Sequence, residues 1–545
     1  MYSTIPTLNA ADRRSKPEMF FAICATLLVV LATSAICWRR SARTNRISRL
    51  RRTILPLLIW SLCGGLFFRI LQTPNWTFNG TRLAPAFALT RGYQLYYPPE
   101  SGPVLETTYA AMTALFYLPT TTLRTPNSAV IVGSLLTVIS CFIPLLLLTL
   151  RNRRGRLDLS ARLFGFLILG LLVLYCEPLR YSCINVHADG PALAFGGMAC
   201  VCLLRRPHSR AALVCAAILA VMSPWAKQTA LPLLGGVALY LVLADGWRTL
   251  ARFLLLYAAA AVVISSAFML AFDPRRVWFN LVTVQAKVFV STGALATKLV
   301  QGVRGMVHSG DLIIIAVVIG VVSTLVSHNR GRYRIRSWAR RNDWSLLFFV
   351  GLFGIPVSIL ARVKTGGDID SFSFVLYYFN AAVGMLAAEL MQCIRPSAGQ
   401  NEFSAYQITT MAAVSVVILI EVPTLFGIPQ AVHDLNHTDQ QVAYYYLRQH
   451  AGSAYFPWLP LAHVMAEGKV YHSAFGVVDR ELSGNRLSTQ HFRSGIPGRA
   501  MFVAYRSEGI DNIGGCDLRA YLPEFSTLGT NPDLPGWTIL EKHSD

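Results

Sequence analysis

The sequence predicts an all-α polytopic membrane bundle of about twelve transmembrane helices, with a small α/β domain at its C-terminal end. Two observations lead to this fold class. Of the 545 residues, 54% are hydrophobic and only 14% are charged, whereas an average soluble chain has about 25% charged residues. The 49 basic residues exceed the 28 acidic ones, for a net charge of +21. They lie in short clusters between apolar runs, which is typical of loops that orient a membrane protein and gives no reason to expect nucleic acid as a partner.

Apolar runs of roughly 20 residues, the length that crosses a bilayer, define the expected spans. They are residues 19–37, 53–71, 127–150, 163–179, 188–204, 211–226, 230–244, 253–271, 312–327, 344–360, 374–391 and 408–426. The first run is too long for the core of a signal peptide and is followed by no A-x-A cleavage site, so we expect it to be retained as a span.

Clusters of arginine assign the two sides of the membrane. The loop after the first span carries seven arginines between residues 39 and 52, and with these spans every later cluster falls on the same side. The positive-inside rule makes that side cytoplasmic, which predicts a multi-pass protein of the plasma (inner) membrane with both termini outside. A crossing by residues 104–123 would reverse every later cluster, so this stretch is expected to lie along the outer surface.

Three regions follow from this topology. Residues 1–52 form an extra N-terminal span and a basic cytoplasmic loop. Residues 53–426 form the transmembrane domain, with a large first outer loop at 72–126. Residues 427–545 are less hydrophobic and alternate short β-like runs with helical ones, which predicts a small α/β domain outside the membrane.

The sharpest candidate site opens the fifth span, where Asp189 follows His187 and precedes Pro191. An aspartate at the start of an apolar helix is costly and is usually functional or paired. The alternative is that Asp189 only caps the helix and that His187 is an interfacial side chain.

A second candidate lies between two short spans, where Lys227 and Gln228 sit on the outer side. The lysine is placed to present an ammonium to a phosphate group. The alternative is a lysine that extends to the membrane interface without a ligand.

The first outer loop is the third candidate. It combines aromatic residues with Arg82, Tyr97, Glu100 and Glu106. Aromatic rings stack on sugars and carboxylates accept hydrogen bonds from sugar hydroxyls, so the loop suits a sugar site. The alternative is an aromatic belt at the membrane surface.

Signals for a metal ion are weaker. His433 and His437 are four residues apart, but no third ligand accompanies them. Asp368 and Asp370 lie in a glycine-rich outer loop that suits a cation, a sugar or simply a solvated turn. We therefore assign no residue to a metal.

Together, these motifs resemble the GT-C superfamily of polytopic glycosyltransferases, in the bacterial branch of the protein O-mannosyltransferases and the lipid A aminoarabinose transferase. His187-Ala188-Asp189-Gly190-Pro191 resembles the aspartate motif that opens a later span. Ala226-Lys227-Gln228-Thr229 resembles the lysine motif between two spans, and residues 91–103 resemble a pattern of the first loop.

The resemblance implies that a sugar moves from a polyprenyl-phosphate donor to an envelope acceptor outside the cytoplasm, by an inverting displacement. Lys227 would hold the donor phosphate, Asp189 and His187 would line the site, and a divalent cation is a candidate cofactor. The family usually places an aspartate early in the first outer loop as the base, but residues 71–98 contain no acid and present Asn75 and Asn79 instead.

Either Asp189, Glu100 or Glu106 therefore takes the role of the base, or the protein is no longer an active transferase. Two other classes stay open. One is a flippase or transporter of lipid-linked intermediates, and the other is an inactive membrane scaffold.

Overall fold

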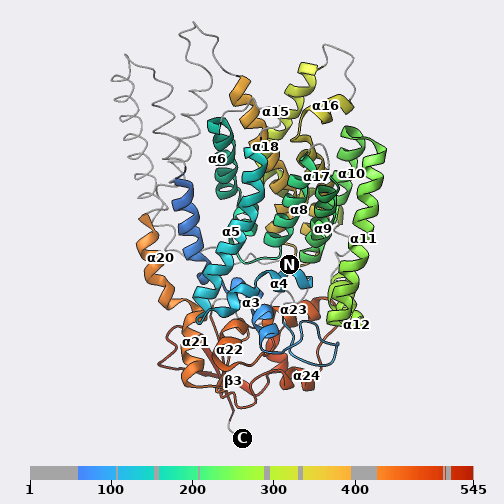
Figure 1. Ribbon diagram of the computed structural model, residues 1–545. Helices are drawn as coiled ribbons and strands as arrows, with labels where there is room; N and C mark the ends of the chain where they lie inside the picture. Colours follow the sequence, from blue (N-terminus) through green and yellow to red (C-terminus); the bar gives the residue numbers. More distant parts are fainter. Residues whose placement is uncertain are drawn as a thin grey trace, which may run out of the picture.

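The computed structural model describes residues 59, 61–105, 109–151, 159–205, 209–287, 295–328, 335–393, 426–506, 510 and 517–543. Its helices run between two ends of an elongated molecule, and the C-terminal helices and strands gather at the end drawn lowest in Figure 1. We call this end the lower end and the opposite one the upper end.

Long apolar helices form the body of the bundle. Those at its centre are α5 (Pro126–Leu150), α6 (Leu159–Tyr175), α8 (Asp189–Leu204), α9 (Arg210–Ala226), α10 (Pro232–Ala244), α17 (Ser345–Val363) and α18 (Ser373–Cys393). Glycines allow close packing, since a Cβ atom on Gly165 of α6 would lie only 2.5 Å from the backbone oxygen of Gly384 in α18. Such small-residue contacts are typical of helices packed within a membrane.

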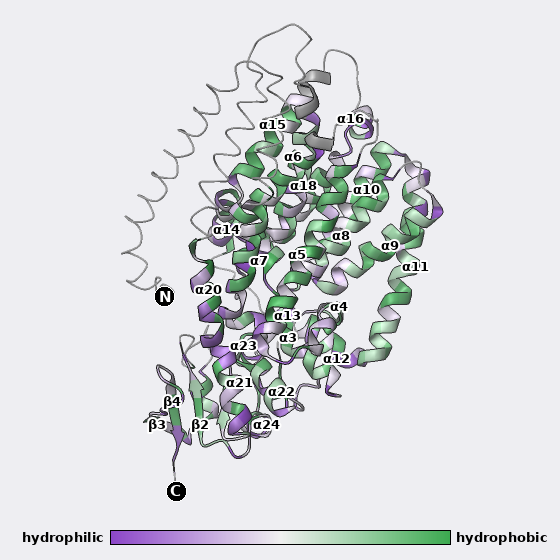
Figure 2. Ribbon diagram, turned by 60° about the vertical axis from the view of Figure 1, so that its left-hand side comes forward, coloured by the Kyte–Doolittle hydropathy of each residue, from purple (hydrophilic) through white to green (hydrophobic). Residues whose placement is uncertain are grey.

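Other helices present apolar side chains to the surroundings. In α11 (Trp247–Phe272), only 6% of the most apolar stretch is buried, and Leu255 and Leu270 are 73% and 82% exposed. Helix α15 (Asp311–His328) also exposes isoleucine and valine side chains. Figure 2 shows hydrophobic residues along these helices and more hydrophilic ones around α21 and α24. A helix that exposes apolar side chains is stable when lipid surrounds it. Several such helices make the chain a multi-pass membrane protein.

The predicted spans correspond to helices where the structure describes them, except that 163–179 extends past the end of α6 into α7. The number of spans stays a prediction. Among the described residues, four helices are long and apolar enough to cross a membrane, or up to six if each of two bent pairs is one span. Three further apolar helices, 189–204, 210–226 and 228–244, are shorter. The predicted span 19–37 and nearly all of 408–426 lie outside the described residues.

The upper end carries helix ends that flank several of the arginine-rich stretches. Helix α16 (Ile335–Arg341) lies there, together with the last turns of α5 and α8 and the first turns of α9 and α11. Arg151, directly after α5, forms an ion pair of 3.3 Å with Asp343, directly before α17. This arrangement agrees with the predicted topology, while the cytoplasmic identity of the upper end stays a prediction.

The lower end consists of short helices. They are η1 (Thr73–Asn75), α3 (Thr77–Thr90), α4 (Ala111–Phe116), η2 (Leu118–Thr122), α7 (Glu177–Ile184), η3 (Gln228–Ala230), α12 (Pro274–Trp278), the π-helix η4 (Phe279–Thr283), α13 (Val284–Lys287), α14 (Leu295–Ser309) and η6 (Ile369–Phe372). Residues 104–123 thus hold two short helices, and neither is long enough to cross a bilayer. The chain bends by 98° between α6 and α7.

The C-terminal part carries a four-stranded sheet. Its strands are β1 (Ala454–Tyr455), β2 (Phe502–Tyr505), β3 (Phe525–Gly529) and β4 (Thr538–Lys542), in the order β1-β2-β4-β3. β1 pairs with β2 in parallel, and the other two pairs are antiparallel. The surrounding helices are α20 (Ile428–Asp434), η7 (Leu435–His437), α21 (Asp439–Gln449), α22 (Pro460–Glu467), α23 (Ala474–Leu482), α24 (Thr489–Ser494) and η8 (Leu518–Tyr521). A domain boundary at residue 427 stays a prediction.

Close contacts fix the C-terminal part against the first loop. Gly80 of α3 has no side chain where Gln440 of α21 packs, and a Cβ atom there would overlap the Gln440 amide. The backbone N–H of Val104 donates to Nδ1 of buried His472 at 2.9 Å, and the carbonyl of Val104 accepts from the N–H of Ser473 at 2.8 Å. These contacts hold residues 102–105 in place.

Protonation of His472 would break this anchor, because Nδ1 must stay unprotonated to accept the Val104 N–H. Burial lowers the pKa of His472 to about 4. The unfolded chain therefore binds a proton at a higher pH than the folded one, and stability falls as the pH drops from about 6.5 to about 4. We expect the melting temperature to fall across this window, and to fall less steeply in His472→Gln. His433→Gln on exposed α20 is the matched control, and an equal slope in His472→Gln and wild type would contradict the prediction.

Candidate functional site

The site is built around the turn that joins α7 to α8. The hydroxyl of Tyr117 donates to the carbonyl of His187 at 3.0 Å and lies 3.2 Å from the His187 N–H. Gly190 packs directly against Thr137, where a Cβ atom would meet Cγ2 at 2.7 Å. Pro191 falls in the first turn of α8, where its missing N–H costs nothing. The turn therefore holds Asp189 at the lower end of the bundle.

Three charged side chains from separate segments meet there. Nζ of Lys227, which follows α9, lies 2.9 Å from Oδ2 of Asp189 and 2.7 Å from Oδ2 of Asp370 in η6. The three side chains are only 9%, 4% and 12% exposed. Buried charges persist only when they are paired in this way. We call Lys227, Asp189, Asp370 and His187 the charge cluster.

His187 completes the charge cluster. Its Nδ1 lies 2.7 Å from Oδ2 of Asp189, and its Nε2 lies 3.5 Å from Oδ2 of Asp370. Nδ1 also lies 3.2 Å from the backbone nitrogen of Asp189. The shorter contact to the carboxylate, which only accepts hydrogen bonds, places the imidazole proton on Nδ1, and Nε2 then accepts from the Tyr109 hydroxyl at 3.3 Å. Ser182 of α7 donates a further hydrogen bond to Oδ2 of Asp189 at 2.9 Å.

A small hollow adjoins the charge cluster. Its lining residues are Arg82, Pro85, Leu95, Tyr109, Ala110, Thr113 and Ala114. Tyr109 connects the hollow to the charge cluster, since the centre of its ring lies 6.0 Å from Nζ of Lys227. The guanidinium of Arg82 donates to the Tyr181 hydroxyl at 3.0 Å and packs over the rings of Trp76 and Phe78. The hollow is therefore apolar, with one cation and two hydroxyl groups.

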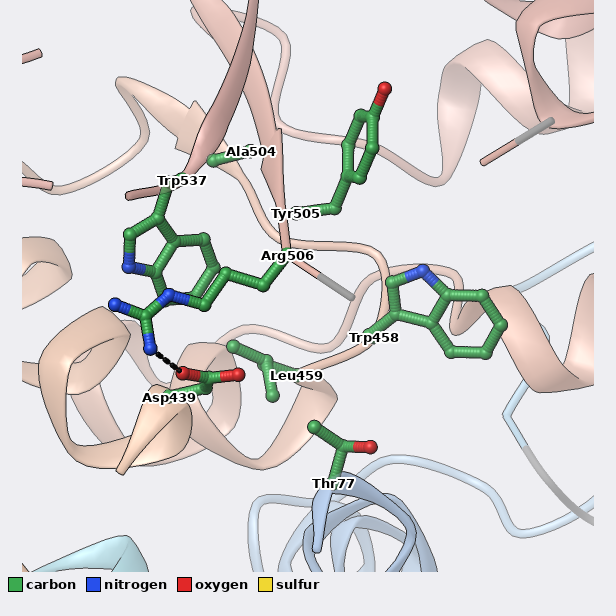
Figure 3. A pocket seen from close by; sticks show the side chains of 8 residues that line it. All are labelled: Thr77, Asp439, Trp458, Leu459, Ala504, Tyr505, Arg506 and Trp537. Carbon is green, nitrogen blue, oxygen red and sulfur yellow. Dashed lines mark hydrogen bonds and ion pairs between the residues drawn. The ribbon is translucent and has the colours of Figure 1, made fainter. Parts of the chain in front are cut away.

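A second hollow, of about 200 Å³, lies between the C-terminal part and the start of α3 (Figure 3). Trp458, Tyr505 and Trp537 line it, and Arg506 forms an ion pair of 2.8 Å with Asp439 at its edge. None of the predicted site residues lines this hollow, so it is not part of the candidate site.

Asn79 stands where the resemblance expects an acid, and its amide is engaged with the backbone. Its Nδ2 donates to the carbonyl of Thr73 at 2.8 Å, and its Oδ1 accepts from the N–H of Val186 at 2.9 Å. Asn79 thus supports the turn that carries His187. An amide cannot take up a proton from an acceptor.

The other predicted site residues are less central. Gln228 begins η3 next to Lys227 and is half-buried. Tyr97 is half-buried beside η4, where its carbonyl accepts from Asn280. Glu100 is exposed and close to Arg480; burial lowers the pKa of Arg480 to about 10, and the charge of Glu100 opposes this shift. Neither Tyr97 nor Glu100 lines the hollow by the charge cluster, and Glu106 lies outside the described residues.

Asp370 is the member of the charge cluster that the sequence analysis did not select. The sequence favours a solvated turn for residues 366–370, and Asp368 indeed is exposed and caps η6 through the N–H of Ile369. Asp370 lies two residues further on, is buried and points to Lys227. No signal in the sequence separates Asp370 from the exposed Asp368, because the burial that distinguishes the two appears only in the folded chain.

A metal ion does not fit the charge cluster. His187, Asp189 and Asp370 do offer three ligand atoms within 4.8 Å of one another. However, the ammonium of Lys227 already bridges the two carboxylates, and a divalent cation among them would face that positive charge at close range. Lys227 supplies the positive charge itself, so we derive no step through a metal.

No protein-family description and no curated protein matches the chain. Among solved structures, apo ArnT from Cupriavidus metallidurans is similar, with a TM-score of 0.50 and 11% identity over 87% of this chain and 95% of that one. ArnT bound to undecaprenyl phosphate has a TM-score of 0.48 and 11% identity, over 92% of this chain and 98% of that one. The apo oligosaccharyltransferase of Archaeoglobus fulgidus has a TM-score of 0.44 and 11% identity, over 87% of this chain and 73% of that one.

Fold and site together define a multi-pass membrane protein with a buried charge cluster beside a hollow at its lower end. More particularly, the fold is GT-C-like, because it is shared with ArnT, a lipid A aminoarabinose transferase. The resemblance predicted from the sequence motifs is confirmed at the level of the fold.

Removal of the Lys227 charge should destabilise the fold. Lys227→Met leaves two buried carboxylates facing each other, and loss of one partner from a buried ion pair typically costs about 3–5 kcal/mol. We expect a strongly lowered melting temperature in detergent, partly restored when Asp189→Asn is added. Lys542→Met, on the exposed edge of β4, is the control, and an unchanged melting temperature in Lys227→Met would show that the ion pairs carry no stability.

Proposed function

We propose that the protein is a membrane glycosyltransferase that moves a sugar from a polyprenyl-phosphate donor to an acceptor on the outer side of the plasma (inner) membrane. The observation that carries the proposal is the buried ammonium of Lys227, held between Asp189 and Asp370 beside a hollow. Such a group of opposite charges supplies what glycosyl transfer from a phosphate requires, namely a cation for the leaving group and carboxylates for the acceptor.

Positive charge on the donor side comes from two residues. Lys227 has three N–H donors, and two of them are directed at the carboxylates of Asp189 and Asp370. Arg82 lines the hollow. In the proposed complex these two cations bind the phosphate and stabilise the negative charge that develops as the sugar leaves.

An apolar route for the prenyl chain adjoins the hollow. Leu95 and Ala114 of the hollow belong to an apolar cluster that also contains Phe268 and Phe272, in the last turns of α11. Among the four long apolar helices of the described residues, α11 has the least buried apolar stretch. We therefore propose that the prenyl chain lies along it and the sugar enters the hollow. Tyr97, Gln228 and Glu100 then belong to the approach to the hollow rather than to its centre.

Asn79 is the observation that favours the alternative of an inactive scaffold, because it replaces the expected acid. A flippase is the other alternative. A single assay separates a transferase from an inactive scaffold and from a flippase. Purified protein in nanodiscs is incubated with radiolabelled polyprenyl-phosphate hexoses and pentoses and with an envelope extract as the source of acceptor. Only a transferase releases free polyprenyl phosphate in step with a labelled product, and its absence with every donor would overturn the proposal.

Asp189→Asn tests the site within this assay. The variant keeps the size of the side chain and leaves Lys227 paired with Asp370, so we expect it to fold. Because Asp189 orients both Lys227 and His187, we expect the turnover number to fall on the order of 100-fold. Asp533→Asn on an exposed C-terminal loop serves as control, and wild-type turnover in Asp189→Asn would remove this residue from the site.

A further inference from the structure

The proposed transfer needs a group that accepts the proton of the acceptor hydroxyl. Asn79 cannot serve, because it is an amide engaged with Thr73 and Val186. Glu100 is exposed and lies near Arg480, outside the charge cluster. Among the described residues, the carboxylates in the charge cluster are Asp189 and Asp370.

These two carboxylates differ in their surroundings. Oδ2 of Asp189 receives hydrogen bonds from Ser182, His187 and Lys227, and the side chain is only 4% exposed. Oδ2 of Asp370 pairs with Lys227 at 2.7 Å, and the side chain is 12% exposed. Asp189 is therefore fixed as the centre of the hydrogen-bond network, whereas Asp370 is the more accessible of the two.

The position of Asp370 in the chain also suits a group that meets a substrate. It lies in η6, a short helix after a glycine-rich loop, and not within a long helix of the bundle. In many proteins, loops and short connecting segments carry the reacting groups, and a rigid scaffold of helices or strands positions these segments. Asp189, by contrast, opens α8 and is enclosed by its neighbours.

We infer that Asp370 is the catalytic base and accepts the proton that Asn79, an amide, cannot accept. This inference rests on the proposed function. The acceptor oxygen forms a bond to the anomeric carbon of the sugar, and its proton passes to the carboxylate of Asp370. The bond between the anomeric carbon and the phosphate oxygen breaks, and its electron pair leaves with the polyprenyl phosphate, which Lys227 and Arg82 bind.

Lys227 links the two halves of this reaction. Without a donor, its ammonium is paired with Asp370 and weakens that carboxylate as a base, because a neighbouring cation favours the ionised form. A donor phosphate competes for the same ammonium. As Lys227 turns to the phosphate, Asp370 loses part of its pairing and becomes a stronger base, so the base is ready only when a donor is bound.

The experiment compares Asp370→Asn with Asp368→Asn in nanodiscs, using a donor that the wild type consumes. Asp368 is the matched control, since it lies two residues away, is exposed, and only caps η6, a role that asparagine also performs. Transfer to the envelope acceptor, the KM for the donor, and donor cleavage in the presence of sodium azide are measured. Azide attacks the anomeric carbon without giving up a proton, so it needs no base.

We expect Asp370→Asn to reduce transfer on the order of 100-fold or more, which is the usual effect of losing a general base. The KM for the donor should not rise, because Asp370 no longer competes with the phosphate for Lys227, and azide should restore donor cleavage, with a glycosyl azide as product. Asp368→Asn should behave like the wild type. Asp370→Glu retains a carboxylate, and we expect part of the transfer activity to persist in it even if Asp370→Asn folds poorly.

Two results would overturn the inference. Transfer at the wild-type rate in Asp370→Asn would show that another group takes the proton. Loss of both transfer and azide-driven cleavage in folded Asp370→Asn would assign Asp370 to donor binding instead. Neither result affects the proposed function, which fails separately if the wild type consumes no polyprenyl-phosphate sugar at all.

Discussion

The lower end of the molecule depends on one interaction, the ammonium of Lys227 between the carboxylates of Asp189 and Asp370. The partners are 38 and 143 residues from Lys227 in sequence, and each reaches the cluster through a different turn of the chain. Since a buried charge without a partner is strongly destabilising, the three turns have to form together. The interaction thus serves both as the centre of the candidate site and as the constraint that aligns α8, α9 and α18.

The membrane helices could largely be predicted from the sequence, because a run of apolar residues has the length of the helix it forms. Predicted span 127–150 corresponds to Pro126–Leu150, and 211–226 corresponds to Arg210–Ala226. The prediction 163–179 runs past the end of α6, since the chain turns by 98° after Tyr175 while Cys176, Pro178 and Leu179 extend the apolar run. Hydropathy reports the environment of a residue and carries no information on the direction of the helix axis.

The candidate site was only partly predictable, for a related reason. Asp189 and Lys227 stand out because each interrupts an apolar stretch, and the fold brings them to 2.9 Å. Asp370 follows glycines and a second aspartate, a pattern that also describes a solvated turn, so only its tertiary position reveals its role. Glu100 was selected from the sequence but is exposed in the structure. The composition of a loop rich in aromatic residues and acids does not indicate which side chains face the hollow and which face water.

The short helices of the bundle have a consequence for where the chemistry takes place. Helix α8 has 16 residues and α9 has 17, which at 1.5 Å per residue gives lengths of about 24–26 Å. The hydrocarbon layer of a bilayer is about 30 Å thick. If their arginine-bearing ends lie at one face of that layer, their other ends stop short of the opposite face by several ångströms. The charge cluster then sits several ångströms inside the hydrocarbon layer, beneath the lipid headgroups, so in the proposed complex a lipid-borne phosphate has to enter the protein to reach Lys227 while its hydrocarbon tail remains in the membrane.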